Sequence, residues 1–194
     1  MHGLINKSVQ AFLRDNYGPS LWSRVAQDIG IGPEGFEAML RYDDALTEDL
    51  IRAAMAALDK PRAVVLEDIG AYLATVEPVR RLLRFSGTDY WEFLFSLEEL
   101  QGRGRMALPD LEFPELRFNA ECRGRFTLEV RGPIPGWGAV IAGLLRAMAD
   151  DYGALVLIEV IEPQGICERV QVLLLEAAYV EGRRFDLARP RGGL

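Results

Sequence analysis

The sequence is poor in the side chains that bind metals or act as nucleophiles. Its 194 residues include one histidine, His2, and two cysteines, Cys122 and Cys167. A multi-histidine metal site and a histidine-based catalytic triad away from the N-terminus are therefore excluded. Two cysteines are also too few for a disulfide framework or a cysteine-based zinc site. We expect both to be buried, inert thiols in a reducing cytoplasm.

Long hydrophobic runs and an excess of positive charge are also missing. No apolar run approaches the roughly 18 residues that a membrane span needs, and residues 1–15 lack the pattern of a signal peptide. The net charge of −7 argues against nucleic acid as a partner, because phosphate binding requires a basic surface. A composition that is 49% hydrophobic and 26% charged is typical of a globular domain. We expect a cytoplasmic protein with no membrane span.

Apolar residues recur at helical spacing through the first part of the chain. The pattern predicts five helices before residue 86, with breaks at Gly18-Pro19 and Lys60-Pro61. Asp44 or Thr47 is expected to cap the third helix. The fourth helix, over residues 64–74, contains Gly70. Because glycine costs about 1 kcal/mol relative to alanine inside a helix, Gly70 predicts close packing against another backbone or a ligand.

After residue 114 the pattern changes to strands around one helix. The predicted elements are strands at 115–121 and 125–131, an amphipathic helix at 137–152, and strands at 154–161 and 168–178. The fold class is therefore predicted to be α+β: a helical N-terminal half followed by a four-stranded antiparallel sheet with helices.

One domain is expected over residues 1–180, because the chain shows no internal repeat and no linker. Within it we separate a helical subdomain, to about residue 62, from an α/β subdomain over residues 63–180. Residues 181–194 are polar, basic and glycine-ended, which predicts a poorly ordered tail.

The stretch 89–114 has the most distinctive pattern. A helix over residues 89–103 is predicted, with Gly102 and Gly104 ending it. Its apolar face is formed by residues spaced three and four apart: Tyr90, Phe93, Leu94, Leu97 and Leu100. Gln101 closes this face, where a helix would present a side chain toward a buried pocket.

Paired carboxylates do not indicate catalysis in this chain. Asp43-Asp44 and Glu98-Glu99 are adjacent in sequence, so on a helix the two side chains of each pair diverge. Helix caps and solvated faces account for them, and no enzyme activity is expected.

Several segments, taken in order, resemble one protein family. They are MHGLINKSVQ at the start, Asn16-Tyr17-Gly18-Pro19 with Trp22, Tyr42-Asp43-Asp44 with Thr47 and Asp49-Leu50, Gly70, Phe93-Leu94, Pro114 and Gly143-Leu144-Leu145. To about Val180 the chain resembles the haem-nitric-oxide/oxygen-binding (H-NOX or HNOB) domain family. That family includes the sensor domain of soluble guanylate cyclase and stand-alone bacterial gas sensors.

The resemblance implies a haem site whose binding groups are absent here. In the family a histidine on the long helix ligates the iron, and a Tyr-x-Ser-x-Arg signature binds the haem propionates. The histidine position falls on Gln101, and a glutamine amide is a poor iron ligand. The signature falls on Val130, Gly132 and Ile134, so its three donors are missing. A proline that packs against the porphyrin is kept as Pro114.

The walls of the family's pocket remain apolar. A distal polar position of the oxygen-binding members falls on Leu73, and the wall positions Ile5 and Leu144 are apolar. Leu97 and Leu100 of the long helix complete the expected lining. The resemblance therefore implies a pocket that keeps its walls but lacks the groups that hold iron-porphyrin. Haem in the usual histidine-ligated mode is not expected.

A few other side chains could contact a ligand. His2 is the only imidazole and thus a conceivable iron ligand, although a histidine near a terminus is more often a capping or solvated residue. Arg131 could reach a carboxylate from a register one residue away, and Arg103 or Arg105 could bind an anionic head group. Exposed positions account for these arginines better.

Three functions remain open, of which we favour the first. It is a signalling module that senses or binds another apolar small molecule, or a tetrapyrrole without ligated iron, in the family pocket. The second is a haem-binding nitric oxide or oxygen sensor with atypical ligation. The third is a structural interaction domain whose pocket has closed. The resemblance also implies a separate signalling kinase or a cyclic-nucleotide or cyclic-dinucleotide enzyme as partner.

Overall fold

The computed structural model describes residues 1–85, 87–107, 110, 112–121, 124–132, 134–164 and 167–185. Its elements are α1 (Gly3–Tyr17), α2 (Pro19–Asp28), α3 (Asp44–Leu58), α4 (Arg62–Thr75), α5 (Glu77–Arg84), α6 (Tyr90–Ser96), the 3₁₀ turn η1 (Leu97–Glu99), α7 (Leu100–Ala107), β1 (Glu115–Ala120), β2 (Arg125–Arg131), α8 (Trp137–Tyr152), β3 (Leu155–Gln164) and β4 (Cys167–Glu176). Cys122 lies outside the described residues. Within them, no helix has both the length and the apolarity to cross a membrane.

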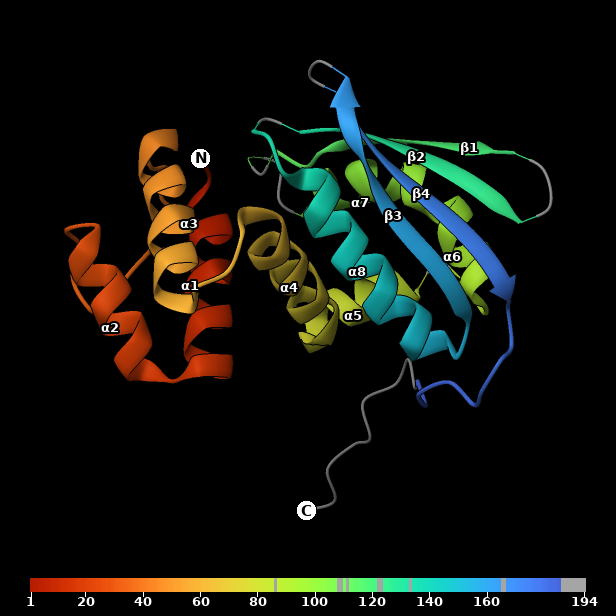
Figure 1. Cartoon of the computed structure of the whole chain (residues 1–194), viewed down its shortest axis with the longest axis horizontal. Coiled ribbons are helices and arrows are strands. Elements are labelled where there is room, and N and C mark those ends of the chain that lie inside the picture. The colour runs from red at the N-terminus through yellow and green to blue at the C-terminus, as the bar shows by residue number, and fades with distance from the viewer. Residues whose placement is uncertain are drawn as a thin grey trace.

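The predicted α+β fold class is confirmed. Figure 1 shows α1, α2 and α3 at one end of the molecule, the sheet at the other, and α4 and α8 between them. The strand order is β1-β2-β4-β3, and each neighbouring pair is antiparallel. Helices α6, α7 and α8 lie on one face of this sheet.

Local sequence accounts for the boundaries of the first helices. Gly18 has a φ of 87°, a conformation that favours glycine, and Pro19 begins α2, where its missing N–H costs little. The cap of α3 is Asp43, whose carboxylate accepts the N–H of Ala45 at 2.9 Å. The prediction of Asp44 or Thr47 as the cap is therefore wrong.

The long helix around residue 97 differs from its prediction in two ways. A 3₁₀ turn interrupts it between α6 and α7, and the helix continues to Ala107. Gly102 and Gly104 lie inside α7, so the prediction that they end the helix is wrong. At Gly104 a Cβ atom would overlap the ring of Phe113, and this glycine thus allows a close approach of the segment before β1.

Two hydrophobic cores lie on either side of the α4–α8 pair. The first joins α1, α2 and α3 to Val65, Leu66 and Ile69 of α4 and to Ala139 of α8. The second fills the space between the sheet, α6, η1 and the rest of α8. Helices α4 and α8 therefore contribute to both cores.

Two glycines bring the backbones of α4 and α8 into direct contact. A Cβ atom at Gly70 would overlap the carbonyl oxygen of Val140, and a Cβ atom at Gly143 would overlap that of Glu67. The close packing predicted from Gly70 is thus confirmed, and Gly70 packs against the backbone of α8. Because backbone atoms cannot rotate away as side chains do, neither position has room for a larger residue.

The start of the expected tail is held against the domain. The N–H of Arg183 donates to the carbonyl of Asp151 at 2.8 Å. The guanidinium of Arg80 donates to the carbonyl of Arg184 at 3.2 Å and to the carboxylate of Asp151 at 2.8 Å. Arg183 and Arg184 therefore contact the domain. Residues 186–194, most of the expected tail, lie outside the described residues, so its poor order stays a prediction.

We predict that Gly70→Ala and Gly143→Ala each lower the free energy of unfolding by about 2–3 kcal/mol, because overpacked helices must shift. Urea unfolding followed by circular dichroism measures the change. Gly102→Ala is the matched control: a Cβ atom there meets nothing within 4 Å, so this variant should gain about 0.5–1 kcal/mol. Wild-type stability in Gly70→Ala would contradict a rigid contact between α4 and α8.

Candidate functional site

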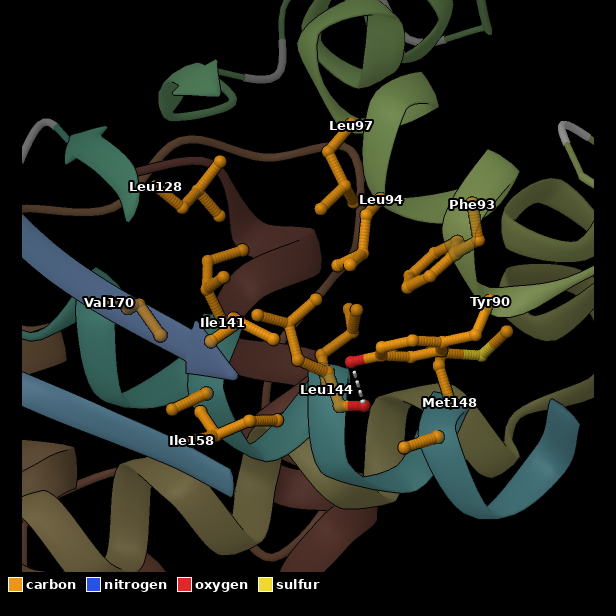
Figure 2. Packing of buried hydrophobic residues seen from close by; sticks show 14 of the residues in the cluster. Tyr90, Phe93, Leu94, Leu97, Leu128, Ile141, Leu144, Met148, Ile158 and Val170 are labelled. Carbon is orange, nitrogen blue, oxygen red and sulfur yellow. Dashed lines mark hydrogen bonds between the residues drawn. The ribbon is translucent and has the colours of Figure 1, made fainter. Parts of the chain in front are cut away.

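The site implied by the resemblance lies between α6, α7, α8 and the inner face of the sheet. Its centre is a packed core rather than an opening (Figure 2). The side chains that meet there are all buried: Tyr90, Phe93, Leu94, Leu97, Leu128, Ile141, Leu144, Met148, Ile158 and Val170. Leu97 and Leu144, two predicted wall residues, contribute to this packing directly.

The phenol hydroxyl of Tyr90 is a polar group within this core. Its hydroxyl donates to the carbonyl of Leu145 on α8 at 3.1 Å (Figure 2). Burial raises the pKa of Tyr90 well above its ordinary value, because the interior disfavours a phenolate. The hydroxyl thus stays protonated, and its hydrogen bond goes to the backbone of α8 rather than to a ligand.

Gln101 lies on α7 and is half-buried. Its Nε2 donates to the backbone carbonyl of Phe113 at 3.2 Å, and the next residue, Pro114, is buried at the start of β1. This bond ties α7 to the chain that enters the sheet. Leu100, its neighbour, is half-buried against the sheet-side core.

The end of β2 is filled by an aromatic ring. Val130 is fully buried, and Ile134 is half-buried in the turn that follows. A Cβ atom at Gly132 would overlap the indole of Trp137, so the ring occupies the space that a side chain would need. Two of the three positions that correspond to the propionate signature, Val130 and Gly132, therefore pack against their own chain.

A carboxylate of the chain itself occupies the N-terminus of α8. Glu168 of β4 pairs with Val130 of β2, and its two oxygens accept the N–H groups of Gly136 at 2.7 Å and Gly138 at 2.9 Å. The N-terminus of a helix attracts anions through its free N–H groups and its dipole. Here the carboxylate of Glu168 takes the place of an external anion.

The remaining predicted wall residues divide between the two cores. Leu97, Leu100, Val130 and Leu144 all belong to the sheet-side core. Leu73, on α4, packs against the other core, and Ile5, on α1, is half-buried. The structure thus brings four of the predicted positions together and leaves Leu73 on the far side of the α4–α8 pair.

The other candidate ligands either have structural partners or are exposed. His2 is 5% exposed and caps α1, with Nδ1 accepting the N–H of Leu4 at 3.2 Å. Arg103 donates to the carbonyl of Ser96 at 3.1 Å. Arg105 and Arg131 are exposed. Within the described residues, no group of three or more histidine, cysteine, aspartate or glutamate side chains could hold a metal ion.

Haem in the family's usual mode does not fit these residues. The amide of Gln101 is bonded to backbone and is a poor iron ligand. Trp137 fills the space beside Gly132. Glu168 presents a negative charge close to where the propionates would bind, and like charges at one site repel.

Sequence reasoning missed Trp137 and Glu168. Trp137 follows a glycine at a helix start, where its position predicts only the beginning of α8. The role of Glu168 depends on the pairing of β4 with β2, because only that register sets it opposite Val130. No local pattern carries this information.

Comparison with known proteins points to one family. A family model described as "Haem-NO-binding" matches residues 2–160. Soluble guanylate cyclase gcy-31 of Caenorhabditis elegans is 26% identical over 167 residues, which is 84% of this chain and 24% of that protein. The chain spans about a quarter of the length of the curated relatives it matches.

Solved structures share the fold at low sequence identity. An H-NOX protein from S. oneidensis in the Fe(II)NO ligation state has a TM-score of 0.77 and 13% identity, covering 91% of this chain and 100% of its own. An oxygen-binding H-NOX domain related to soluble guanylate cyclases has a TM-score of 0.72 and 16% identity, covering 95% and 100%. At this identity the likeness shows the fold alone.

We predict that Glu168→Gln lowers the free energy of unfolding by about 1–2 kcal/mol, because the amide keeps one acceptor and loses the charge at the α8 N-terminus. The control is Glu159→Gln, at an exposed position of β3, which should change stability by less than about 0.5 kcal/mol. Urea unfolding of both variants distinguishes them. Equal stability of the two would argue against a role for Glu168 in closing the site.

Proposed function

The chain belongs to the haem-NO-binding (H-NOX) family, and we propose that it is a haem-independent member that signals by binding a protein partner at its surface. Domains of this family are sensors and are not themselves catalytic, so the matched chain is not an enzyme. The proposal corresponds to the interaction domain with a closed pocket, the third of the functions considered above.

One observation carries this proposal: the propionate end of the family's site is occupied by the chain's own groups. Glu168 supplies a carboxylate to the α8 N-terminus, and Trp137 covers Gly132. A haem would bring two further carboxylates to a place where the cationic and hydroxyl donors are replaced. Buried charges without partners cost several kcal/mol each, and the absence of an imidazole at position 101 removes the iron bond that could offset this cost.

An apolar small molecule or a tetrapyrrole without ligated iron is the second candidate. It is favoured by the wholly apolar lining that Leu97, Leu100, Val130 and Leu144 provide, since ligand pockets are mostly apolar. Against it, an occupant would have to displace side chains that already pack at contact, and overpacking a core costs about 1–3 kcal/mol.

The partner of such a module would be a signalling kinase or a cyclic-nucleotide or cyclic-dinucleotide enzyme. The relative gcy-31 is a soluble guanylate cyclase about four times as long as the segment it shares with this chain. We expect the site of action to be the cytoplasm, because Cys167 is a free thiol and reducing compartments preserve free thiols.

We predict that the purified protein takes up no haem and that Gln101→His does not restore uptake, because the propionate end stays closed. Absorption spectra after haem titration measure this through the Soret band. The H-NOX protein from S. oneidensis, solved in the Fe(II)NO ligation state and treated identically, is the positive control for the titration. A tight five-coordinate haem in Gln101→His would contradict the proposed function.

We also predict that lipophilic ligands leave the melting temperature unchanged. A ligand raises the melting temperature only if it binds the folded state more tightly than the unfolded state, and a filled core offers it no site. Thermal unfolding with a panel of fatty acids and iron-free porphyrin tests this, together with mass spectrometry of organic extracts of the protein. A co-purifying molecule that raises the melting temperature would favour the second candidate instead.

A further inference from the structure

We propose that the exposed side of α6 and η1 is a docking site for an arginine-bearing segment of a protein partner. The site consists of the aromatic pair Trp91 and Phe95 and the neighbouring carboxylates of Glu92 and Glu99. This inference rests on the proposed function, because it names the surface through which a module with a closed interior would bind its partner.

The aromatic pair is exposed although it belongs to a helix that already has a buried face. Trp91 is 41% exposed and Phe95 46% exposed, and their ring centroids lie 5.5 Å apart. The next residues along the helix, Phe93 and Leu94, point into the core. The helix therefore carries apolar residues on two faces, of which the domain covers one fully and the other in part.

The two exposed rings are held in place from behind. Trp91 meets Phe126 edge to face at 4.9 Å, and Phe95 meets Phe118 edge to face at 5.0 Å. Phe118 and Phe126 stack on each other at 5.0 Å, and Phe126 is fully buried. Aromatic side chains that are fixed before binding lose little conformational entropy when a partner docks.

The rings line a shallow hollow of about 340 Å³ together with Glu92, Ser96 and Glu99. These residues are spaced so that they share one side of the helical segment. An aromatic pair beside carboxylates is a surface suited to a cation, because the ring faces attract positive charge and the carboxylates pair with it.

The hollow carries two carboxylates, of which one is already hydrogen-bonded within the chain. Glu92 accepts the N–H and the hydroxyl of Thr88, each at 2.8 Å, and the backbone hydrogen bond is the main cause that lowers its pKa. Glu99 is exposed and has no hydrogen-bond or ion-pair partner among the described residues. Arg103 is the cation beside the hollow, and it is turned onto the carbonyl of Ser96.

These features select an arginine side chain among possible occupants. A planar guanidinium can stack on an indole and pair with a carboxylate at the same time, which a lysine ammonium cannot do as well. Nucleic acid and anionic membranes are disfavoured by the local carboxylates and by the net charge of −7. A purely apolar partner would bury the exposed carboxylate of Glu99 without a cation to pair with it.

The test is a titration of the full chain with a short helical peptide that carries arginine and leucine on one face, followed by NMR. The chain has three tryptophans, and the indole N–H signals of Trp22 and Trp137 serve as internal references. We expect the Trp91 signal alone to shift. Phe95→Ala should weaken binding about tenfold, and Glu99→Gln about threefold, with the latter effect decreasing as salt is added. Trp91→Ala removes the indole signal itself, so its binding is measured from the signals of an isotope-labelled peptide and should also weaken about tenfold.

Matched controls come from the same chain. Phe85→Ala removes a ring that is 73% exposed on another surface, and Glu181→Gln removes an exposed carboxylate; neither should change the affinity. An unchanged Trp137 signal, from an indole packed against the sheet-side core, together with an unchanged Trp22 signal from the other core, shows that each variant is folded.

Two results would overturn the docking site: no Trp91 shift at about 1 mM peptide, or equal binding of a peptide with glutamine in place of arginine. The haem titration is independent of both. A protein without haem uptake and without a Trp91 shift keeps the proposed function and loses this surface, whereas haem uptake removes the proposed function whatever Trp91 does.

Discussion

The backbone contact between α4 and α8 is the constraint on which the rest of the molecule depends. Gly70 and Gly143 each admit a carbonyl of the other helix, so the two helices form one rigid pair. Both hydrophobic cores are built on this pair, one on each side. A change in the angle or distance between α4 and α8 would therefore loosen both cores at once, because interiors at native packing density transmit displacement.

The packed core at the candidate site is also held by contacts at the N-terminus of α8. Glu168 reaches from β4 to the first turn of α8, and Trp137 at the start of the helix covers the end of β2. On the opposite side, the hydroxyl of Tyr90 binds the carbonyl of Leu145. The contacts that would have to open for a ligand are thus the contacts that position α8, and an occupant would have to replace them all.

The fold could be predicted from the sequence more fully than the site. Periodicity gave α8 its observed bounds, 137–152, and Gly70 indicated a close backbone contact, because both signals are local. Gly102 and Gly104 were misread because a glycine that ends a helix and one that admits a ring look alike in sequence. Glu168 was missed because strand register decides its partners. Trp91 and Phe95 lie off the predicted apolar face of the helix, and only the structure shows that both rings stay partly exposed among the described residues.

A cofactor stabilises the fold that binds it, because binding free energy is added to folding free energy. A member of this family without haem must draw that stability from its own side chains, and the altered positions show how. Gln101 bonds to the backbone before β1, Val130 is buried, and Gly132 makes room for Trp137. In the proposed haem-independent member, Gln101, Val130 and Gly132 each take part in a contact within the chain. Under the proposed function the interior is filled by side chains and the surface carries the signal. On that surface α6, the helix before the one that holds Gln101, presents the rings of Trp91 and Phe95 to solvent.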